Sequence, residues 1–169
     1  MAQLARPDPA AWDFRSIYGG HYDAADFAGR AVLLVNTASL CGCTPQYGGL
    51  QRLQDLYGDR GLVVLAVPSD DFKQEEPDDG AVRAFCERTY GITLKMAGIT
   101  RVTGAAAHPL YLWLAEAGFT PEWNFNKALF DRDGGVAGTW GSDDEPLGGD
   151  IEAAVQRTLA MDDGETGSP

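Results

Sequence analysis

Cys41 is the residue of this chain that is best placed for chemistry. It follows residues 31–36, an apolar run typical of a strand buried on both faces. Thr44 and Pro45 come soon after it and predict a helix start, with Thr44 as N-cap and Pro45 at the first helical position. Ligands of α/β sheets bind just beyond the carboxyl ends of strands, and a helix N-terminus favours a thiolate over a thiol. We therefore expect Cys41 to be reactive, the alternative being a buried structural cysteine.

The residues around the other two cysteines, Cys43 and Cys86, are compatible with a packing role. Three cysteines are an odd and sparse set, unlike the even, dense set of a disulfide-stapled secreted domain, so we expect a reducing compartment, most simply the cytoplasm. Cys43 is predicted to be an apolar packing residue, with a backup thiol as the alternative, and Cys86 beside Phe85 fits a small core residue of a helix. A Cys-x-Cys pair with one distant histidine offers too few ligands for a metal, so neither a metal nor another cofactor is expected.

Alternating strand and helix signals must position these cysteines. Residues 62–67 form a second apolar run, and a helix ending at Gly58 joins it to the first. The remaining predicted elements are a helix that carries Val82, Phe85, Cys86 and Tyr90, a helix opened by His108 and Pro109, a hairpin over residues 129–140, and a last helix over 146–160.

The order of these elements predicts the fold class α/β. Two strands joined by a helix should pair in parallel, and the late hairpin should add antiparallel strands. We therefore expect a three-layer sandwich with a mixed central sheet flanked by helices, as in thioredoxin-like proteins. Residues 12–160 are expected to form a single domain, between a flexible arm over 1–11 and a disordered acidic tail over 161–169.

Composition and charge exclude several classes of function. The 169 residues suit one domain, and 44% of them are apolar, which is enough for a buried core. Thirteen Lys and Arg against 25 Asp and Glu give a net charge of −12, which repels phosphate and argues against nucleic acid and anionic membranes. No apolar run approaches the roughly 18 residues of a membrane span, and residues 1–9 lack the apolar region of a signal peptide.

Several segments of the chain, taken in order over about residues 13–160, resemble the glutathione peroxidase family. One such segment would be a weak signal, whereas the full set in the right order is specific. The segments are residues 36–47 around Cys41, Pro68 with Phe72 and Glu76-Pro77, Phe85-Cys86 with residues 90–93, residues 108–111, and residues 123–127. Members of the family that carry a cysteine at this position often use thioredoxin rather than glutathione.

The resemblance implies a role for each site residue. Cys41 would be the peroxidatic cysteine, whose thiolate attacks a peroxide and becomes a sulfenic acid. Trp123 and Asn124 would supply an indole N–H and a polar side chain near the sulfur, although Trp123 would also suit the edge of a core. Cys86 would be the resolving cysteine, which forms a disulfide that an external dithiol reduces. Because Cys41 and Cys86 are expected on different elements, the helix of Cys86 would have to unwind after oxidation.

Asp71 marks the point where the chain departs from the family pattern. Aligned on Phe72 and Glu76-Pro77, the Gln of the family's catalytic tetrad falls on Asp71, and the preceding Asn falls on Asp70. A Gln amide donates a hydrogen bond to sulfur, whereas an ionised carboxylate cannot and would repel a thiolate. Either Asp71 points away from the sulfur, or it stays protonated, helped by Asp70, and gives a proton to the leaving oxygen. Our hypothesis is the second alternative.

The connection before Trp123 bears on the reductant and on assembly. Eight residues, 115–122, separate Leu114 from Trp123, where glutathione-using tetramers of the family carry a longer assembly loop. The short connection resembles the monomeric, thioredoxin-using branch. We expect a monomeric peroxidase that reduces hydrogen peroxide and organic hydroperoxides, with thioredoxin as partner and without nucleic-acid binding or membrane insertion. Glutathione as reductant, a peroxide sensor that relays oxidation, and an inactive thioredoxin-like binding protein are the alternatives.

Overall fold

A mixed five-stranded sheet forms the middle layer of the computed structural model, which describes residues 5–166. Its strands, in spatial order, are β5 (Lys95–Met96), β4 (Leu62–Pro68), β3 (Ala31–Thr37), β6 (Lys127–Phe130) and β7 (Val136–Trp140). The first three are parallel to one another, whereas β6 runs antiparallel to both β3 and β7. The parallel pairing of the two apolar runs and the late antiparallel hairpin are both confirmed.

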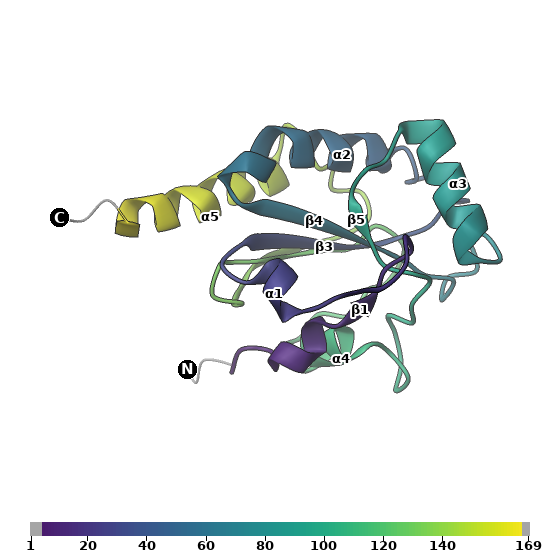
Figure 1. Ribbon diagram of the computed structural model, residues 1–169, viewed down its shortest axis with the longest axis horizontal. Coiled ribbons are helices and arrows are strands. Elements are labelled where there is room, and N and C mark those ends of the chain that lie inside the picture. Colours follow the sequence, from purple (N-terminus) through teal and green to yellow (C-terminus); the bar gives the residue numbers. More distant parts are fainter. Residues whose placement is uncertain (1–4, 167–169) are drawn as a thin grey trace.

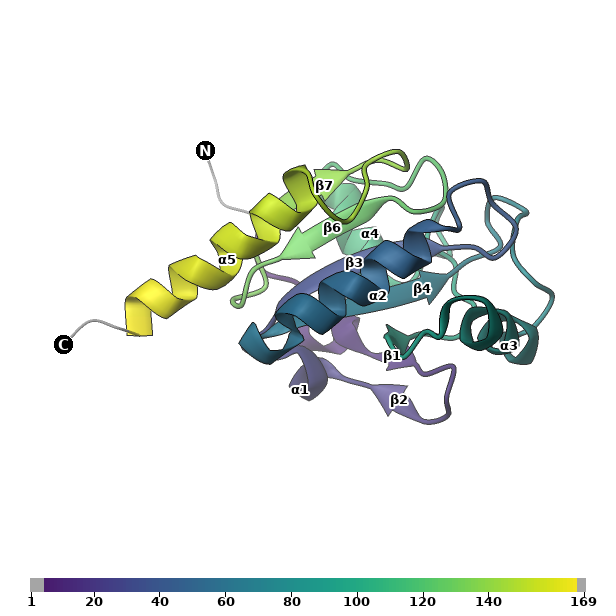
Figure 2. The same cartoon turned by 90° about the horizontal axis from the view of Figure 1, so that it is seen from above.

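Helices cover both faces of the sheet (Figure 1). One face carries α2 (Gln46–Tyr57), α3 (Asp79–Tyr90) and α5 (Asp150–Thr166), and the view from above shows α2 and α5 lying over the sheet (Figure 2). The other face carries α4 (Pro109–Glu116), the turn η1 (Pro9–Trp12) and the short helix α1 (Ala24–Phe27). The other described elements are the two-stranded sheet of β1 (Phe14–Arg15) and β2 (His21–Tyr22), and the turn η2 (Gly58–Arg60). This is the predicted three-layer α/β sandwich.

The core is divided by the sheet into two apolar clusters. Successive side chains of a strand point to opposite faces, so Leu33 and Val35 pack toward α2 and α5 while Val32 and Leu34 pack toward α4 and η1. All residues of β3 and β4 are buried, because helices cover both of their faces. The continuous apolar runs of the sequence follow from this double burial.

His108 begins α4, as the sequence predicts. Its Nδ1 accepts the backbone N–H of Leu110 at 3.1 Å, which makes it the N-cap, and its Nε2 lies 2.6 Å from the carbonyl oxygen of Asp13. Nε2 is therefore the protonated nitrogen of a neutral ring. Burial lowers the pKa of His108, consistent with this neutral form.

The start of the chain packs more closely than the flexible arm that the sequence predicts. The turn η1 lies partly within residues 1–11, Ala11 is buried, and the carbonyl of Ala5 accepts the indole N–H of Trp113 at 3.2 Å. Burial against α4 offsets the loss of chain entropy that would otherwise leave such an arm flexible. Residues 1–4 lie outside the described part of the chain.

The last helix is shifted toward the C-terminus relative to the predicted span of 146–160. Gly148 takes a φ of +79°, which is not helical, so α5 begins only at Asp150. The helix then continues to Thr166, where the sequence predicts a disordered tail over 161–169; residues 167–169 lie outside the described residues. No helix within residues 5–166 combines the length and apolar character that crossing a bilayer requires.

Candidate active site

Cys41 lies in the loop between β3 and α2, at the edge of the sheet where β3 and β4 both end. The register of these strands pairs Thr37 with Pro68, so their carboxyl ends coincide. Cys41 is partly exposed, and its Sγ accepts the backbone N–H of Cys43 at 3.3 Å. A hydrogen bond from a backbone N–H stabilises negative charge on the atom that accepts it. Cys41 is thus partly open to solvent, and its sulfur lies where a backbone N–H would stabilise a thiolate.

Thr44 holds the cysteine loop in shape and does not cap α2. Its Oγ1 accepts the backbone N–H of Cys41 at 3.0 Å and donates to the carbonyl of Ala38 at 2.9 Å. The helix begins at Gln46 without a side-chain cap, so the predicted Thr44 cap is wrong. Backbone carbonyls of residues 43–45 accept the first amides of α2 in tight turns, which removes the need for a capping hydroxyl.

A turn before β6 positions Trp123 and Asn124. Phe125 takes a φ of +61°, a conformation that residues other than glycine adopt rarely. Its buried ring packs against Tyr47 at 5.4 Å between centroids, and its N–H donates to the carbonyl of Asn36 at 2.6 Å. The side-chain amide of Asn36 donates to the carbonyl of Trp123 at 2.8 Å. Asn36, near the end of β3, therefore fixes this turn.

Trp123 and Asn124 differ sharply in exposure. Trp123 is 40% exposed and its ring lies 5.4 Å from that of Phe72, so it does not anchor a core. Asn124 is fully buried; its carbonyl accepts the hydroxyl of Ser142 at 2.7 Å, and its Nδ2 donates to Oε1 of Gln74 at 3.0 Å. The structure thus brings the loop after β4 and the Trp-Asn turn together at the edge that carries the cysteine loop.

Lys127 holds the loop of residues 141–144, which bonds to Asn124. Its Nζ is buried and donates to the carbonyls of Gly141 at 3.1 Å and Asp144 at 2.6 Å. Burial lowers the pKa of Lys127 to about 8, with Asp144 opposing this change. Ser142, which donates to Asn124, lies within the loop that these bonds hold.

Gln74 and Asn36 are site residues that the sequence analysis missed. The carbonyl of Gln74 accepts the N–H of Leu40, one residue before Cys41, at 2.9 Å. The side-chain Oε1 of Gln74 accepts a hydrogen bond from Nδ2 of Asn124. Asn36 could have been found as a polar residue at the end of an apolar strand. For Gln74 the signal was an amide side chain three residues after Asp71 in the same loop.

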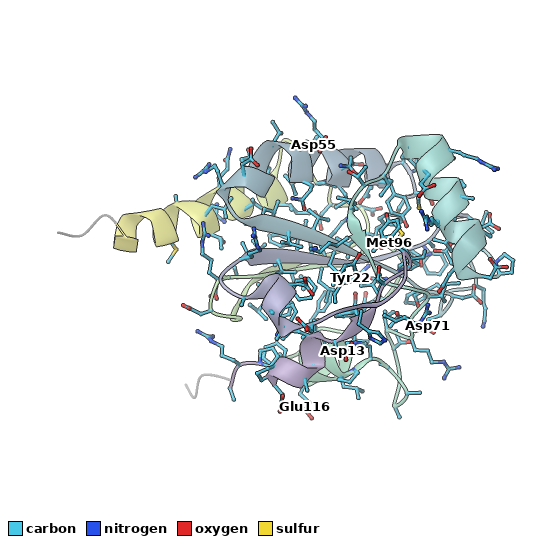
Figure 3. All side chains as sticks on the ribbon, viewed as in Figure 1. Asp13, Tyr22, Asp55, Asp71, Met96 and Glu116 are labelled. Carbon is cyan, nitrogen blue, oxygen red and sulfur yellow. The ribbon has the colours of Figure 1, made fainter. Side chains whose placement is uncertain are left out.

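Asp71, labelled in Figure 3, is bonded to the loop that follows β5. Its Oδ2 accepts the N–H of Val102 at 2.7 Å, and both the N–H and the hydroxyl of Thr103 at 3.0 and 3.1 Å. These bonds fasten two loops to each other. The placement favours the alternative in which Asp71 points away from the sulfur, and not our hypothesis of a proton donor.

The tethering role predicts a stability effect for Asp71→Ala. Removing the acceptor of three hydrogen bonds leaves two backbone N–H groups without a partner, which should lower the free energy of unfolding by about 1–3 kcal/mol. Urea denaturation at pH 7 measures this effect. If Asp71 were instead a proton donor, Asp71→Asn would oxidise Cys41 more slowly and with an altered pH profile, while its stability would be unchanged.

Cys86 lies on α3 and is 1% exposed. Burial raises the pKa of Cys86 to about 11, with a nearby Tyr47 hydroxyl opposing this change. The thiol is therefore protonated and a poor nucleophile at neutral pH as long as α3 is intact. Only Val82 and Cys86 of this helix are fully buried, so α3 has few core contacts to hold it in place.

Cys43 packs at the margin of the core between the sheet and α2, a position that agrees with its predicted packing role. It is partly buried against the apolar cluster that includes Tyr47 and Leu50. Burial raises the pKa of Cys43, and the neighbouring Cys41 adds to this effect. Its backbone N–H, in contrast, serves the sulfur of Cys41.

Glu75 is a buried carboxyl group beside the cysteine loop that the sequence analysis also missed. Its Oε1 accepts the N–H of Ser39 at 3.0 Å and that of Glu76 at 2.8 Å, while its buried Oε2 has no hydrogen-bond partner. Burial raises the pKa of Glu75 to about 7, an effect that the hydrogen bonds from Ser39 and Glu76 only partly offset.

Fold and site together define a class: thioredoxin-like proteins with a partly exposed cysteine just before the first long helix. A family model described as glutathione peroxidase matches residues 11–115. The chain is 43% identical over 148 residues to a hydroperoxy fatty acid reductase of Synechocystis, covering 79% of this chain and 85% of that protein. It is 38% identical over 145 residues to a glutathione peroxidase-like peroxiredoxin of Chlamydomonas reinhardtii, covering 82% and 90%. The chain belongs to the glutathione peroxidase family, and it is a peroxidase.

Solved structures agree with this fold and family. The apo crystal structure of the protein named Trgpx superposes with a TM-score of 0.71 at 29% identity, covering 92% of this chain and 97% of that one. A thiol:disulfide interchange protein of Chlorobium tepidum gives 0.64 at 18% identity, covering 92% and 99%, and shows the thioredoxin-like fold alone.

Proposed function

We propose that this peroxidase reduces hydrogen peroxide and organic hydroperoxides through Cys41 and Cys86, and that thioredoxin returns it to the thiol form. The observation that carries the proposal is the partly exposed Cys41 sulfur, which accepts a backbone N–H at the sheet edge. The Trp123-Asn124 turn lies at the same edge and is joined to the cysteine loop through Gln74.

The first step is attack of the Cys41 thiolate on a peroxide. The sulfur takes the terminal oxygen of the peroxide ROOH, so that an S–O bond forms and the O–O bond breaks. Cys41 becomes a sulfenic acid, and the alkoxide or hydroxide that leaves takes up a proton to give an alcohol or water. Sulfur is oxidised by two electrons and the peroxide is reduced by two.

The second step joins Cys86 to the oxidised Cys41. The Cys86 thiol displaces the sulfenic oxygen as water, and a disulfide forms between the two sulfurs. Because Cys86 is only 1% exposed within α3, its thiol reaches Cys41 only if α3 opens, and opening also removes the burial that keeps the thiol protonated. A dithiol reductant then attacks the disulfide, leaves as its own disulfide and restores both cysteines by thiol–disulfide exchange.

Exposed apolar side chains in the loops at the sheet edge that carries Cys41 support organic hydroperoxides as substrates and a protein as the reductant. Leu40 is 58% exposed and Trp123 is 40% exposed, which gives the site an apolar border. Such a surface suits the acyl part of an organic hydroperoxide or the docking face of a protein partner. The names of the two relatives, a hydroperoxy fatty acid reductase and a peroxiredoxin, are consistent with both. We place the cycle in a monomer, in a reducing compartment such as the cytoplasm.

Reductant-dependent peroxide consumption tests the proposed function. The wild-type protein is assayed with hydrogen peroxide and either thioredoxin, thioredoxin reductase and NADPH, or glutathione, glutathione reductase and NADPH. Turnover with thioredoxin supports the proposal, and turnover with glutathione alone would make the reductant assignment wrong. Inactivity with both reductants would contradict the proposed cycle as a whole.

Asp79, the first residue of α3, offers a way to change the opening of this helix. Its carboxylate pairs with Arg15 and accepts the N–H of Ile99 at 2.9 Å. Asp79→Ala should therefore open α3 more often and speed disulfide formation after one equivalent of peroxide by about 3- to 10-fold, since about 1 kcal/mol is a factor of five. Rapid quenching and mass spectrometry measure the rate. Arg88→Ala, on the same helix, is the control, and equal rates in all three proteins would contradict the opening step.

A further inference from the structure

A cavity of about 350 Å³ lies between three segments at the end of the sheet opposite Cys41. The segments are the start of the chain with η1, the helix α1 with the residues up to Arg30, and the turn between β6 and β7. Arg30 comes directly before β3, whereas the cysteine loop follows the other end of this strand (Figure 1). The seven residues of β3 put roughly 20 Å between the cavity and that loop. The cavity is therefore separate from the proposed peroxidase site.

Buried aromatic and aliphatic side chains form the inner wall of this cavity. Trp12 and Phe27 are 8% and 4% exposed, their ring centroids lie 5.3 Å apart, and Val32 is 1% exposed. Trp12 also meets the ring of Phe130 edge to face at 4.9 Å, so the wall continues into the apolar cluster that packs against α4. A wall of this kind suits an apolar chain, which gains free energy on leaving water.

Three arginines line the same cavity in a protein whose net charge is −12. Arg6 and Arg30 are exposed, and their guanidinium groups make no hydrogen bond or ion pair with the described part of the chain. The guanidinium of Arg132 is held by the backbone, since it donates to the carbonyls of Arg60 at 2.8 Å and Gly29 at 3.4 Å. Guanidinium groups bind carboxylates and phosphates with two parallel hydrogen bonds. The cavity thus combines an apolar wall with donors for an anion.

Two aspartates of the turn between β6 and β7 limit the charge that the cavity can take. Oδ1 of Asp131 accepts the N–H groups of Asp133 and Gly135 at 2.8 and 3.0 Å, so this oxygen serves the turn itself. Asp133 is exposed and also lines the cavity. Three arginines against two aspartates leave a net charge of +1. This charge matches one carboxylate better than a phosphate group, which carries nearly two negative charges at neutral pH.

We propose that this cavity binds an amphipathic carboxylate, a molecule with one carboxylate and an unbranched acyl chain. The chain lies against Trp12 and Phe27, and the carboxylate is bound by Arg6 and Arg30. Binding is non-covalent and uses no group of the cysteine loop, so the site is additional to the proposed peroxidase cycle.

Titration calorimetry with decanoate, below the concentration at which it forms micelles, tests the apolar part of the site. We expect saturable binding of one decanoate per protein. Octanoate should bind about 10-fold more weakly, because each buried CH₂ group is worth about a factor of four in affinity. Decanol has the same chain without the charge and should bind about 3- to 10-fold more weakly than decanoate.

Substitutions of the two exposed arginines test the carboxylate part. Arg6→Gln and Arg30→Gln should each raise the Kd of decanoate by about 3- to 10-fold, because each removes a charged donor from the cavity. Arg88→Gln is the matched control, since it makes the same change of charge at an exposed position on α3, away from the cavity. Its Kd should equal that of the wild type.

Backbone amide spectra of the ¹⁵N-labelled protein locate the bound decanoate. The amide signals of residues 28–32 and 131–135 should shift on titration, whereas those of residues 39–46 around Cys41 should not. Shifts centred on residues 39–46 would place decanoate at the peroxidase site and overturn the proposal.

Three further results would also overturn it. These are the absence of saturable binding at millimolar decanoate, equal affinity for decanol and decanoate, and an unchanged Kd in both Arg6→Gln and Arg30→Gln. Peroxide consumption is measured separately and decides the proposed function, so the binding site and the peroxidase cycle can fail independently.

Discussion

Cys86→Ser is expected to lose thioredoxin-supported turnover down to the level of the reaction without enzyme. Serine cannot form a disulfide, so the cycle should stop after the first oxidation, with Cys41 held as a sulfenic acid. The steady-state rate is followed by NADPH consumption with thioredoxin and thioredoxin reductase. Trapping with dimedone and mass spectrometry show whether the sulfenic acid accumulates. Cys41→Ser should abolish both turnover and trapping, because the peroxidatic sulfur itself is absent.

Cys43→Ser is the matched control for this experiment. It removes a third thiol near the site but keeps the backbone N–H that donates to Cys41, so turnover should continue. The reverse pattern, an inactive Cys43→Ser beside an active Cys86→Ser, would transfer the resolving role to Cys43. Turnover in both single variants would contradict an obligatory role of Cys86, because either Cys43 can replace it or the reductant attacks the sulfenic acid directly.

Glu75→Gln is expected to change the free energy of unfolding more favourably at pH 8 than at pH 4.5, by about 3 kcal/mol. The pKa of Glu75 is raised from 4.5 to about 7 in the folded protein, mainly by burial. Between these two values the folded protein binds more protons than the unfolded chain, so stability falls as pH rises, and the full penalty is present above about pH 7. Glutamine has the shape of the neutral acid and should escape this penalty while still accepting the N–H of Ser39.

Urea denaturation at several values between pH 4.5 and 8 measures this prediction. The informative quantity is the difference in unfolding free energy between Glu75→Gln and the wild type, because the other carboxylates are common to both proteins. Glu116→Gln, on the exposed end of α4, controls for the loss of one negative charge. A stability difference for Glu75→Gln that stays constant across this pH range would show that burial does not retain the proton on Glu75.

The effect of Glu75 depends on neighbours that the sequence places far away. Ser39 donates to it from the cysteine loop, and the pKa values of Tyr47 and Cys86 are raised in part by its proximity. In the sequence, Glu75 is only one acidic residue of a polar loop. Its burial arises because β3 and β4 end together and their following loops close against one another.

Elements with strong local signals could be predicted well. The apolar runs of β3 and β4 and the His108-Pro109 start of α4 are expressed in consecutive residues, and each prediction was confirmed. The strands β1, β2 and β5 have only two residues each, which is too short to show a period. The Thr44 cap failed for a different reason, since tertiary contacts use the hydroxyl to close the cysteine loop.

The sequence by itself determined the family, the α/β sandwich and the chemistry-bearing types of residue, because these are properties of composition, order and spacing. Only the tertiary structure decided which neighbours the side chains of these loops bond to. Asp71 and Gln74 are three residues apart in one polar loop, yet one bonds to residues 102–103 and the other to Asn124. A positive φ at Lys73 and the convergence of three loops at one sheet edge separate them, and no local pattern encodes that convergence.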